Sequence, residues 1–141
     1  FPYTMPISDI VGLRTAVDNV LADTEIYARH AKIAAATREA LTKAGLHLYL
    51  QSGYSNTVTV IEVPEGLTDQ AILSTMRDKY NVMISGCFDV LAGKVIRIGH
   101  MGENANEADL CMTLAAMDKT FEDLGYPLQC SMKEVFLKSL A

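Results

Sequence analysis

The segment "GKVIRIGHMG" (residues 93–102) places an arginine inside an apolar run that has the two-residue period of a β-strand. In a strand, Arg97 and Gly99 point to one face of the sheet, whereas Ile96 and Ile98 point to the other. We expect the isoleucine face to pack against helices. Arg97 then lies on the open face, either as a solvated surface side chain or as an anion clamp, because its planar guanidinium can bind a carboxylate through two parallel hydrogen bonds.

The rest of the chain alternates between helical and strand periods around this segment. Helical spacing of apolar residues predicts five helices, which begin near Ser8, Thr24, Thr68, Asn106 and Leu128. A period of two predicts four strands, at residues 46–50, 57–63, 81–86 and 94–99. This order predicts an α+β fold, with a small, mostly antiparallel sheet and helices packed on one face. For one strand pair, parallel pairing through the middle helix is the alternative.

The composition limits the classes of function. With 141 residues, 50% of them hydrophobic, the chain fits one globular domain with a core. The formal net charge of -5 argues against nucleic acid as a partner, and no apolar run approaches the roughly 20 residues of a membrane span. Cys87, Cys111 and Cys130 are odd in number and form no C-x-x-C pair, which indicates neither a disulfide framework nor a zinc site. We therefore expect a cytoplasmic location, without a membrane.

Few other residues suggest chemistry. His30, His47 and His100 are scattered along the chain, and this does not indicate a metal site. No Ser/His/Asp or Cys/His/Asp arrangement is recognisable, and the glycines of residues 93–102 lack the spacing of a phosphate-binding loop. From pattern alone, the chain is an α+β domain with a candidate anion site at Arg97.

Four segments resemble a known family. "GKVIRIGHMG" resembles the strand and turn near the C-terminus of class V aminotransferases, the pyridoxal-phosphate enzymes that include serine–pyruvate and alanine–glyoxylate aminotransferase. Residues 1–18 resemble that family's passage from the large cofactor domain into the small domain, residues 27–41 its long helix, and residues 56–66 its first sheet strands. The resemblance implies that residues 1–7 are a transition segment from a missing large domain, and that residues 8–141 are the small domain of a fold-type-I aminotransferase.

The resemblance also implies roles for individual residues. The arginine that binds the substrate carboxylate in this family falls on Arg97. The threonine that donates to the cofactor phosphate of the neighbouring subunit falls on Thr4, whereas Phe1 stands where several relatives place a tyrosine that also reaches this phosphate. The lysine that binds pyridoxal 5'-phosphate lies upstream in the family. We therefore expect no catalytic residue on this chain, no metal, no cofactor bound to the fragment, and no transamination by the chain alone.

The function that the resemblance implies is that of a longer enzyme. The parent transfers an amino group from a small amino acid, alanine or serine, to a 2-oxo acid, glyoxylate or pyruvate, and acts as a homodimer. The alternative is a stand-alone module that binds small carboxylates or regulates without catalysis. The chain begins with Phe1 instead of methionine, which favours the fragment over the module.

Overall fold

All five predicted helices are present in the computed structural model, which describes residues 3–141. In chain order the elements are α1 (Ile7–Ala22), α2 (Ile26–Lys43), β1 (Val58–Glu62), α3 (Asp69–Tyr80), β2 (Ser85–Gly86), the short 3-10 helix η1 (Asp89–Leu91), β3 (Val95–Gly99), a second one η2 (Gly102–Asn104), α4 (Glu107–Asp123) and α5 (Met132–Leu140). Two helices begin at caps that the sequence indicates. Thr68 accepts a hydrogen bond from the N–H of Ala71 at 3.2 Å, and Asn106 accepts one from the N–H of Asp109 at 2.8 Å.

The sheet has three strands in the order β1-β3-β2 across the described residues, and both neighbouring pairs are antiparallel. The parallel alternative is therefore wrong. Strand β3 is central, so Arg97 lies between two partners, opposite Val60 in β1 and opposite Ser85 in β2. The segment of residues 93–102 therefore contains the central strand of the sheet.

Two of the predicted strands are shorter than expected. The strand predicted at residues 46–50 is reduced to one bridge, between Leu48 and Ile61, because the turn-rich segment that follows leads the chain away from the β1 edge. The strand predicted at residues 81–86 is reduced to β2. Asn81 takes a left-handed φ of 54° to end α3, so the extended conformation begins only afterwards.

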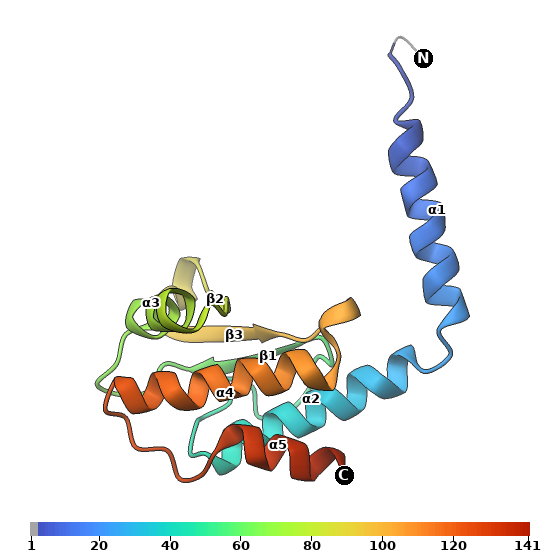
Figure 1. The fold of residues 1–141 in the computed structure, drawn as a ribbon. Coiled ribbons are helices and arrows are strands. Elements are labelled where there is room, and N and C mark those ends of the chain that lie inside the picture. Colours follow the sequence, from blue (N-terminus) through green and yellow to red (C-terminus); the bar gives the residue numbers. More distant parts are fainter. Residues whose placement is uncertain (1–2) are drawn as a thin grey trace.

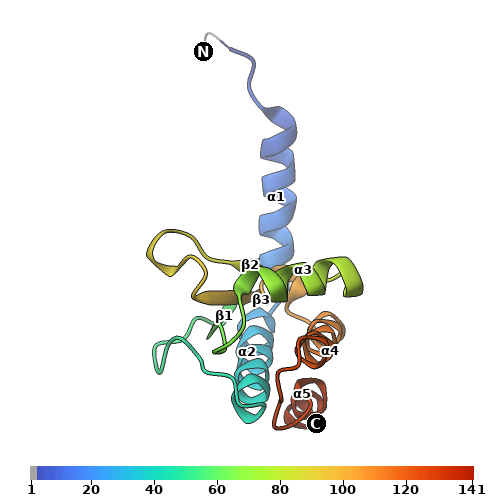
Figure 2. The ribbon, with the colours of Figure 1, turned by 90° about the vertical axis from the view of Figure 1, so that its left-hand side faces the viewer.

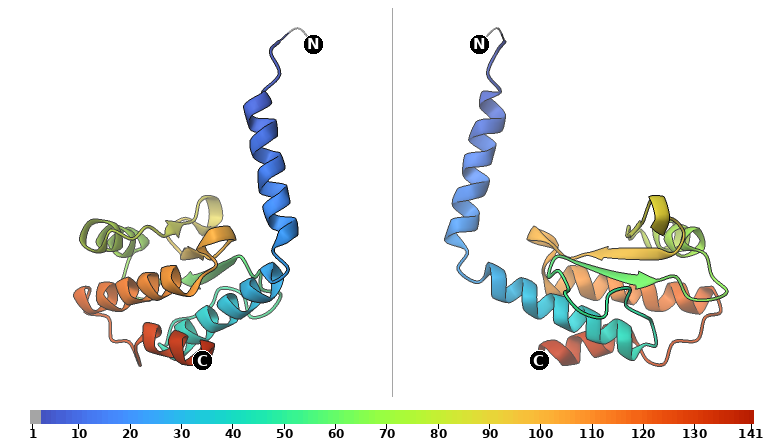
Figure 3. Two further views of the ribbon diagram at one scale, coloured as in Figure 1. Left: turned by 45° about the vertical axis from the view of Figure 1, so that its right-hand side comes forward. Right: turned by 180° about the vertical axis from the view of Figure 1, so that it is seen from behind.

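The helices α2, α3, α4 and α5 lie on one side of the sheet, as Figure 2 shows. Seen from behind, β1 and β3 lie in front of α2, α4 and α5 (Figure 3, right). Ile96 and Ile98 are buried in the core between sheet and helices, together with Ile61 of β1. The predicted α+β fold, with helices on the isoleucine face, is confirmed.

Helix α1 projects from this body instead of packing on it (Figure 1). None of its residues is buried, and its apolar side chains are exposed: Ile7, Ile10, Val11, Leu13, Val17, Val20 and Leu21. Its base is held by Arg29 of α2, whose guanidinium pairs with both carboxylate oxygens of Asp23 between the two helices. No helix of residues 3–141 combines the length and the hydropathy that a membrane crossing requires.

Candidate carboxylate site

The side chain of Arg97 is half-buried on the face of the sheet opposite the core. Its Nε donates a hydrogen bond of 2.8 Å to the backbone carbonyl of Gly86 in β2. The ring centroid of Phe88 lies 5.9 Å from its Cζ atom. These contacts come from β2 and the segment that follows it, so this face is less open than the sequence indicates. Val95, on the same face, is buried.

The terminal nitrogens of Arg97 are free among the described residues. A guanidinium carries five N–H donors, and the bond to Gly86 uses only the one on Nε. None of the ion pairs within residues 3–141 involves Arg97. The arrangement leaves the planar fork of Nη1 and Nη2 available to a carboxylate from outside.

The segment beside Arg97 is held close to α3. A Cβ atom at Gly86 would lie 3.3 Å from Cδ1 of Leu73 and 3.4 Å from Oδ2 of Asp69, which is a tight fit for any larger residue. Asp89 takes a positive φ of 55° as η1 begins. This local geometry places Phe88 over the sheet with 75% of its surface exposed.

Two histidines anchor the turn that follows β3. His100 is fully buried, and its Nε2 lies 2.8 Å from the hydroxyl of Thr59. From α2, His30 accepts a hydrogen bond of 3.0 Å from the N–H of Gly102. Burial lowers the pKa of His100, so its ring is neutral near pH 7. Both histidines are therefore structural supports of the strand that carries Arg97.

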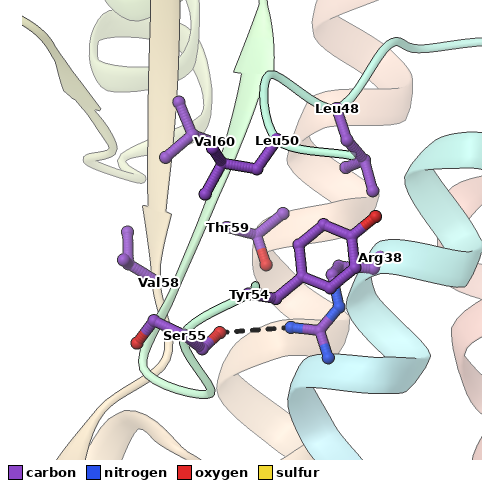
Figure 4. Close-up of a pocket in the computed structure, with 8 residues that line it drawn as sticks. All are labelled: Arg38, Leu48, Leu50, Tyr54, Ser55, Val58, Thr59 and Val60. Atoms are coloured by element: carbon purple, nitrogen blue, oxygen red, sulfur yellow. Dashed lines mark hydrogen bonds between the residues drawn. The ribbon is translucent and has the colours of Figure 1, made fainter. Parts of the chain in front are cut away.

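A second arginine, Arg38 of α2, lines a small cavity with the residues drawn in Figure 4. Its guanidinium lies 4.7 Å from the ring centroid of Tyr54, and Nη1 donates to the carbonyl of Ser55 at 3.2 Å. The cavity has a volume of about 50 Å³, whereas pockets that hold drug-sized ligands measure roughly 300 Å³ or more. Arg38 therefore fastens the loop before β1, and Arg97 is the better candidate for ligand binding.

The structure does not bring Thr4 together with Arg97. Thr4 is exposed and precedes α1, whose N-terminal end points away from the sheet (Figure 1). Phe1 lies outside the described residues. Within the described part of the chain, no group of three His, Cys, Asp or Glu side chains could hold a metal ion.

None of the lysines offers the buried amine that a covalently bound aldehyde cofactor requires. All seven are exposed: Lys32, Lys43, Lys79, Lys94, Lys119, Lys133 and Lys138. An amine that is exposed to water and has no activating environment is a weak nucleophile. The residues of this chain therefore do not make a complete cofactor site by themselves.

The sequence alone identified Arg97 but missed Gly86 and Phe88. The stretch "GCFDVLAG" (residues 86–93) has no helical or strand period that marks it as a partner of β3. The sequence shows His100 beside the strand, but it does not predict the contact of His100 with Thr59, because the two residues are 41 positions apart. Only the pairing of the strands shows these relationships.

No model of a known protein family matches the chain. Comparison with individual proteins, however, finds aminotransferases both by sequence and by structure. Serine–glyoxylate aminotransferase of Arabidopsis thaliana is 38% identical over 132 residues, which are 91% of this chain and 33% of that protein. The crystal structure of pyridoxamine–pyruvate aminotransferase from Mesorhizobium loti superposes with a TM-score of 0.91 at 32% identity, covering 99% of this chain and 37% of that one. Alanine–glyoxylate aminotransferase from Nostoc sp. gives a TM-score of 0.76 at 28% identity, over 86% of this chain and 33% of that one. The chain thus spans about a third of the length of these relatives.

Proposed function

We propose that this chain, which is homologous to class V aminotransferases over nearly its whole length, acts as the small domain of a pyridoxal-phosphate-dependent aminotransferase. Because it spans about a third of its relatives, the activity belongs to a longer protein of which this chain is a part. Residues 1–7 are then the transition from the large domain, and residues 8–141 the small domain. The observation that supports this best is the free guanidinium fork of Arg97 on the central strand.

The reaction that we propose is the transfer of an amino group from a small amino acid, such as alanine or serine, to a 2-oxo acid, such as glyoxylate or pyruvate. Every such amino acid and 2-oxo acid carries a carboxylate beside the reacting carbon. Arg97 would bind this carboxylate through Nη1 and Nη2 while Gly86 holds Nε. Fixing the carboxylate at two points orients the substrate, which is the main contribution of such an arginine to the rate.

The cofactor would be bound mainly by residues outside this chain. Pyridoxal phosphate, when bound, supplies an electron sink for the carbon that loses its proton. All lysines here are exposed, so the group that holds the cofactor covalently must come from the large domain. Thr4 would add one neutral hydroxyl to the phosphate of the neighbouring subunit, and this role requires a homodimer. We propose a cytoplasmic location, since the partly exposed Cys87, Cys111 and Cys130 are free thiols.

The exposed apolar side chains of α1 are consistent with a further domain that packs against this helix. A superposition that covers 99% of this chain includes α1, so the same projecting helix occurs in a protein of which this chain spans 37%. A contiguous apolar surface of this kind marks a site where another part of a protein packs. We propose that the large domain covers it in the complete protein.

The test is the substitution Arg97→Lys in the complete protein, with Arg77→Lys as the control. Lysine keeps the charge but replaces a bidentate fork with a point charge, so kcat/KM for alanine and serine should fall by about ten-fold or more. Among residues 3–141, Arg77 pairs with its neighbour Asp78 alone, on the surface of α3, and its substitution should leave kcat/KM unchanged. Equal cofactor content and equal kcat/KM in Arg97→Lys and wild type would contradict the proposal.

The alternative function, a stand-alone module, makes a different prediction for the isolated chain. Such a module would bind pyruvate or alanine saturably without a large domain. Calorimetric titration of the 141-residue chain with each compound distinguishes the two functions. The aminotransferase proposal expects only weak, non-saturating binding, because Arg97 supplies one side of the site.

A further inference from the structure

Phe88 is the aromatic residue beside the free fork of Arg97. Its ring lies 5.9 Å from the guanidinium carbon, within the range of a cation–π interaction. It is 75% exposed, so its position does not result from packing in the core. The backbone places it there, through the bond from Arg97 to Gly86 and the positive φ of Asp89.

Among the described residues, a second arginine–aromatic pair differs from that of Arg97 in the use of its guanidinium nitrogens. Arg38 lies 4.7 Å from the ring of Tyr54 and is bonded through Nη1 to Ser55, so its fork is partly used. At Arg97 only Nε is used, and the ring of Phe88 stands beside a fork that is open to a ligand. The first pair closes a loop, whereas the second forms a corner with a cationic side and an apolar side.

The ring of Phe88 forms the apolar side of this corner. The face of an aromatic ring is itself electronegative. A ligand with one carboxylate can pair with Arg97, whereas a second carboxylate nearby would meet an aromatic face.

We propose that Phe88 is a positioning and specificity-determining residue for the carboxylate ligand of Arg97. Its ring restricts the guanidinium to one orientation and presents an apolar wall to the group next to the bound carboxylate. The site thereby favours monocarboxylates with small, uncharged substituents over dicarboxylates. This inference rests on the proposed role of Arg97 in substrate binding.

The positioning role can be tested on the 141-residue chain without cofactor. In proton–nitrogen correlation spectra, the Nε–H signal of Arg97 should shift in Phe88→Leu, because leucine has the bulk but lacks the ring current. Phe88→Tyr should restore the wild-type signal. Val90→Ala, which removes another exposed apolar side chain of the same segment, should leave it unchanged.

The specificity role is tested in the complete protein. Phe88→Leu should lower kcat/KM for alanine and serine by about two- to five-fold, mainly through a higher KM, since the contact is of the exposed cation–π kind. Its preference for alanine over glutamate as donor should fall as well, and Phe88→Tyr should retain both values. If Arg97→Lys impairs the enzyme while Phe88→Leu changes neither the Nε–H signal nor the donor preference, this inference is wrong and the proposed function stands. If Arg97→Lys has no effect, both are wrong.

Discussion

The hydroxyl of Thr59 donates a hydrogen bond of 2.8 Å to Nε2 of His100, across 41 positions of sequence. The other ring nitrogen, Nδ1, lies 3.2 Å from the backbone carbonyl of Asn56, which can only accept. Nδ1 therefore carries the proton, and Nε2 is the acceptor. A neutral ring satisfies both partners, whereas a protonated ring would donate from Nε2 to the Thr59 hydroxyl and would place a positive charge in a buried position.

Stability should therefore decrease in mild acid. The pKa of His100 is lowered below its ordinary value of 6.5, because burial outweighs the favourable bond to Asn56. The unfolded chain then binds a proton that the folded chain does not, so the free energy of unfolding falls as the pH drops below about 6.5 and through the lowered pKa. Urea unfolding between about pH 7.5 and 5 should show this slope.

The matched variant is His100→Gln, which retains a polar side chain without a titratable ring. It should be less stable at pH 7 by roughly 1–3 kcal/mol, because buried partners lose their hydrogen bonds. Its stability should also depend less on pH in the same range. The carboxylates with lowered pKa values, such as Asp23 and Glu39, act at lower pH and leave this window clear. An unchanged pH slope in His100→Gln would contradict the assignment.

Local sequence rules predicted the helix ends of this fold well. Asn106 was predicted as the start of a helix, and in the structure its side chain accepts a hydrogen bond of 2.8 Å from the N–H of Asp109 and donates one of 2.8 Å to the Asp109 carboxylate. These interactions join residues that are close in the chain, so the local sequence is sufficient to predict them. Strand ends depend on distant partners, and for this reason residues 46–50 were assigned to a strand that forms only one bridge.

For the candidate site, too, the local features could be predicted and the contacts between distant residues could not. The alternation around Arg97 was sufficient to place its side chain opposite the isoleucines. The contact of its Nε with Gly86 depends on the pairing of β2 with β3, which no local pattern of residues 86–93 indicates. The face of Arg97 could thus be predicted, but not the partners that hold it.

Asp118 of α4 should contribute to stability as the cap of α5. Its carboxylate accepts hydrogen bonds from the N–H of Met132 at 2.8 Å and from the hydroxyl of Ser131 at 2.7 Å. This cap also explains why α5 begins at Met132 instead of near Leu128. Asp118→Ala should lower the free energy of unfolding by about 1–2 kcal/mol, measured with urea. Glu122→Ala, one turn later and exposed, is the control and should change little.

Tyr80 should ionise only at high pH. Its hydroxyl donates to the carboxylate of Asp123 at 2.6 Å, and this bond raises the pKa of Tyr80 to about 12. Absorbance titration of the phenolate should show one late step that disappears in Tyr80→Phe. In Asp123→Asn the step should move down toward the ordinary value of 10.0. A late step that persists in Tyr80→Phe would belong to another tyrosine.

The exposed apolar side chains of α1 should make the isolated chain self-associate weakly. Leu13 is 65% exposed and Val17 is 46% exposed on a helix that buries none of its residues. In the absence of a large domain, such surface associates with other copies without a defined geometry. Light scattering should show a monomer at low micromolar concentration and a gradual increase in mass above it. The double variant Leu13→Glu, Val17→Glu should remain monomeric with an unchanged Tm, because these side chains support no part of the core.

In the complete protein the same variant should lower the Tm, since there the charges would meet the surface that covers α1. A tight dimer of the isolated chain at micromolar concentration, or an unchanged Tm of the complete variant, would show that the large domain does not cover this helix.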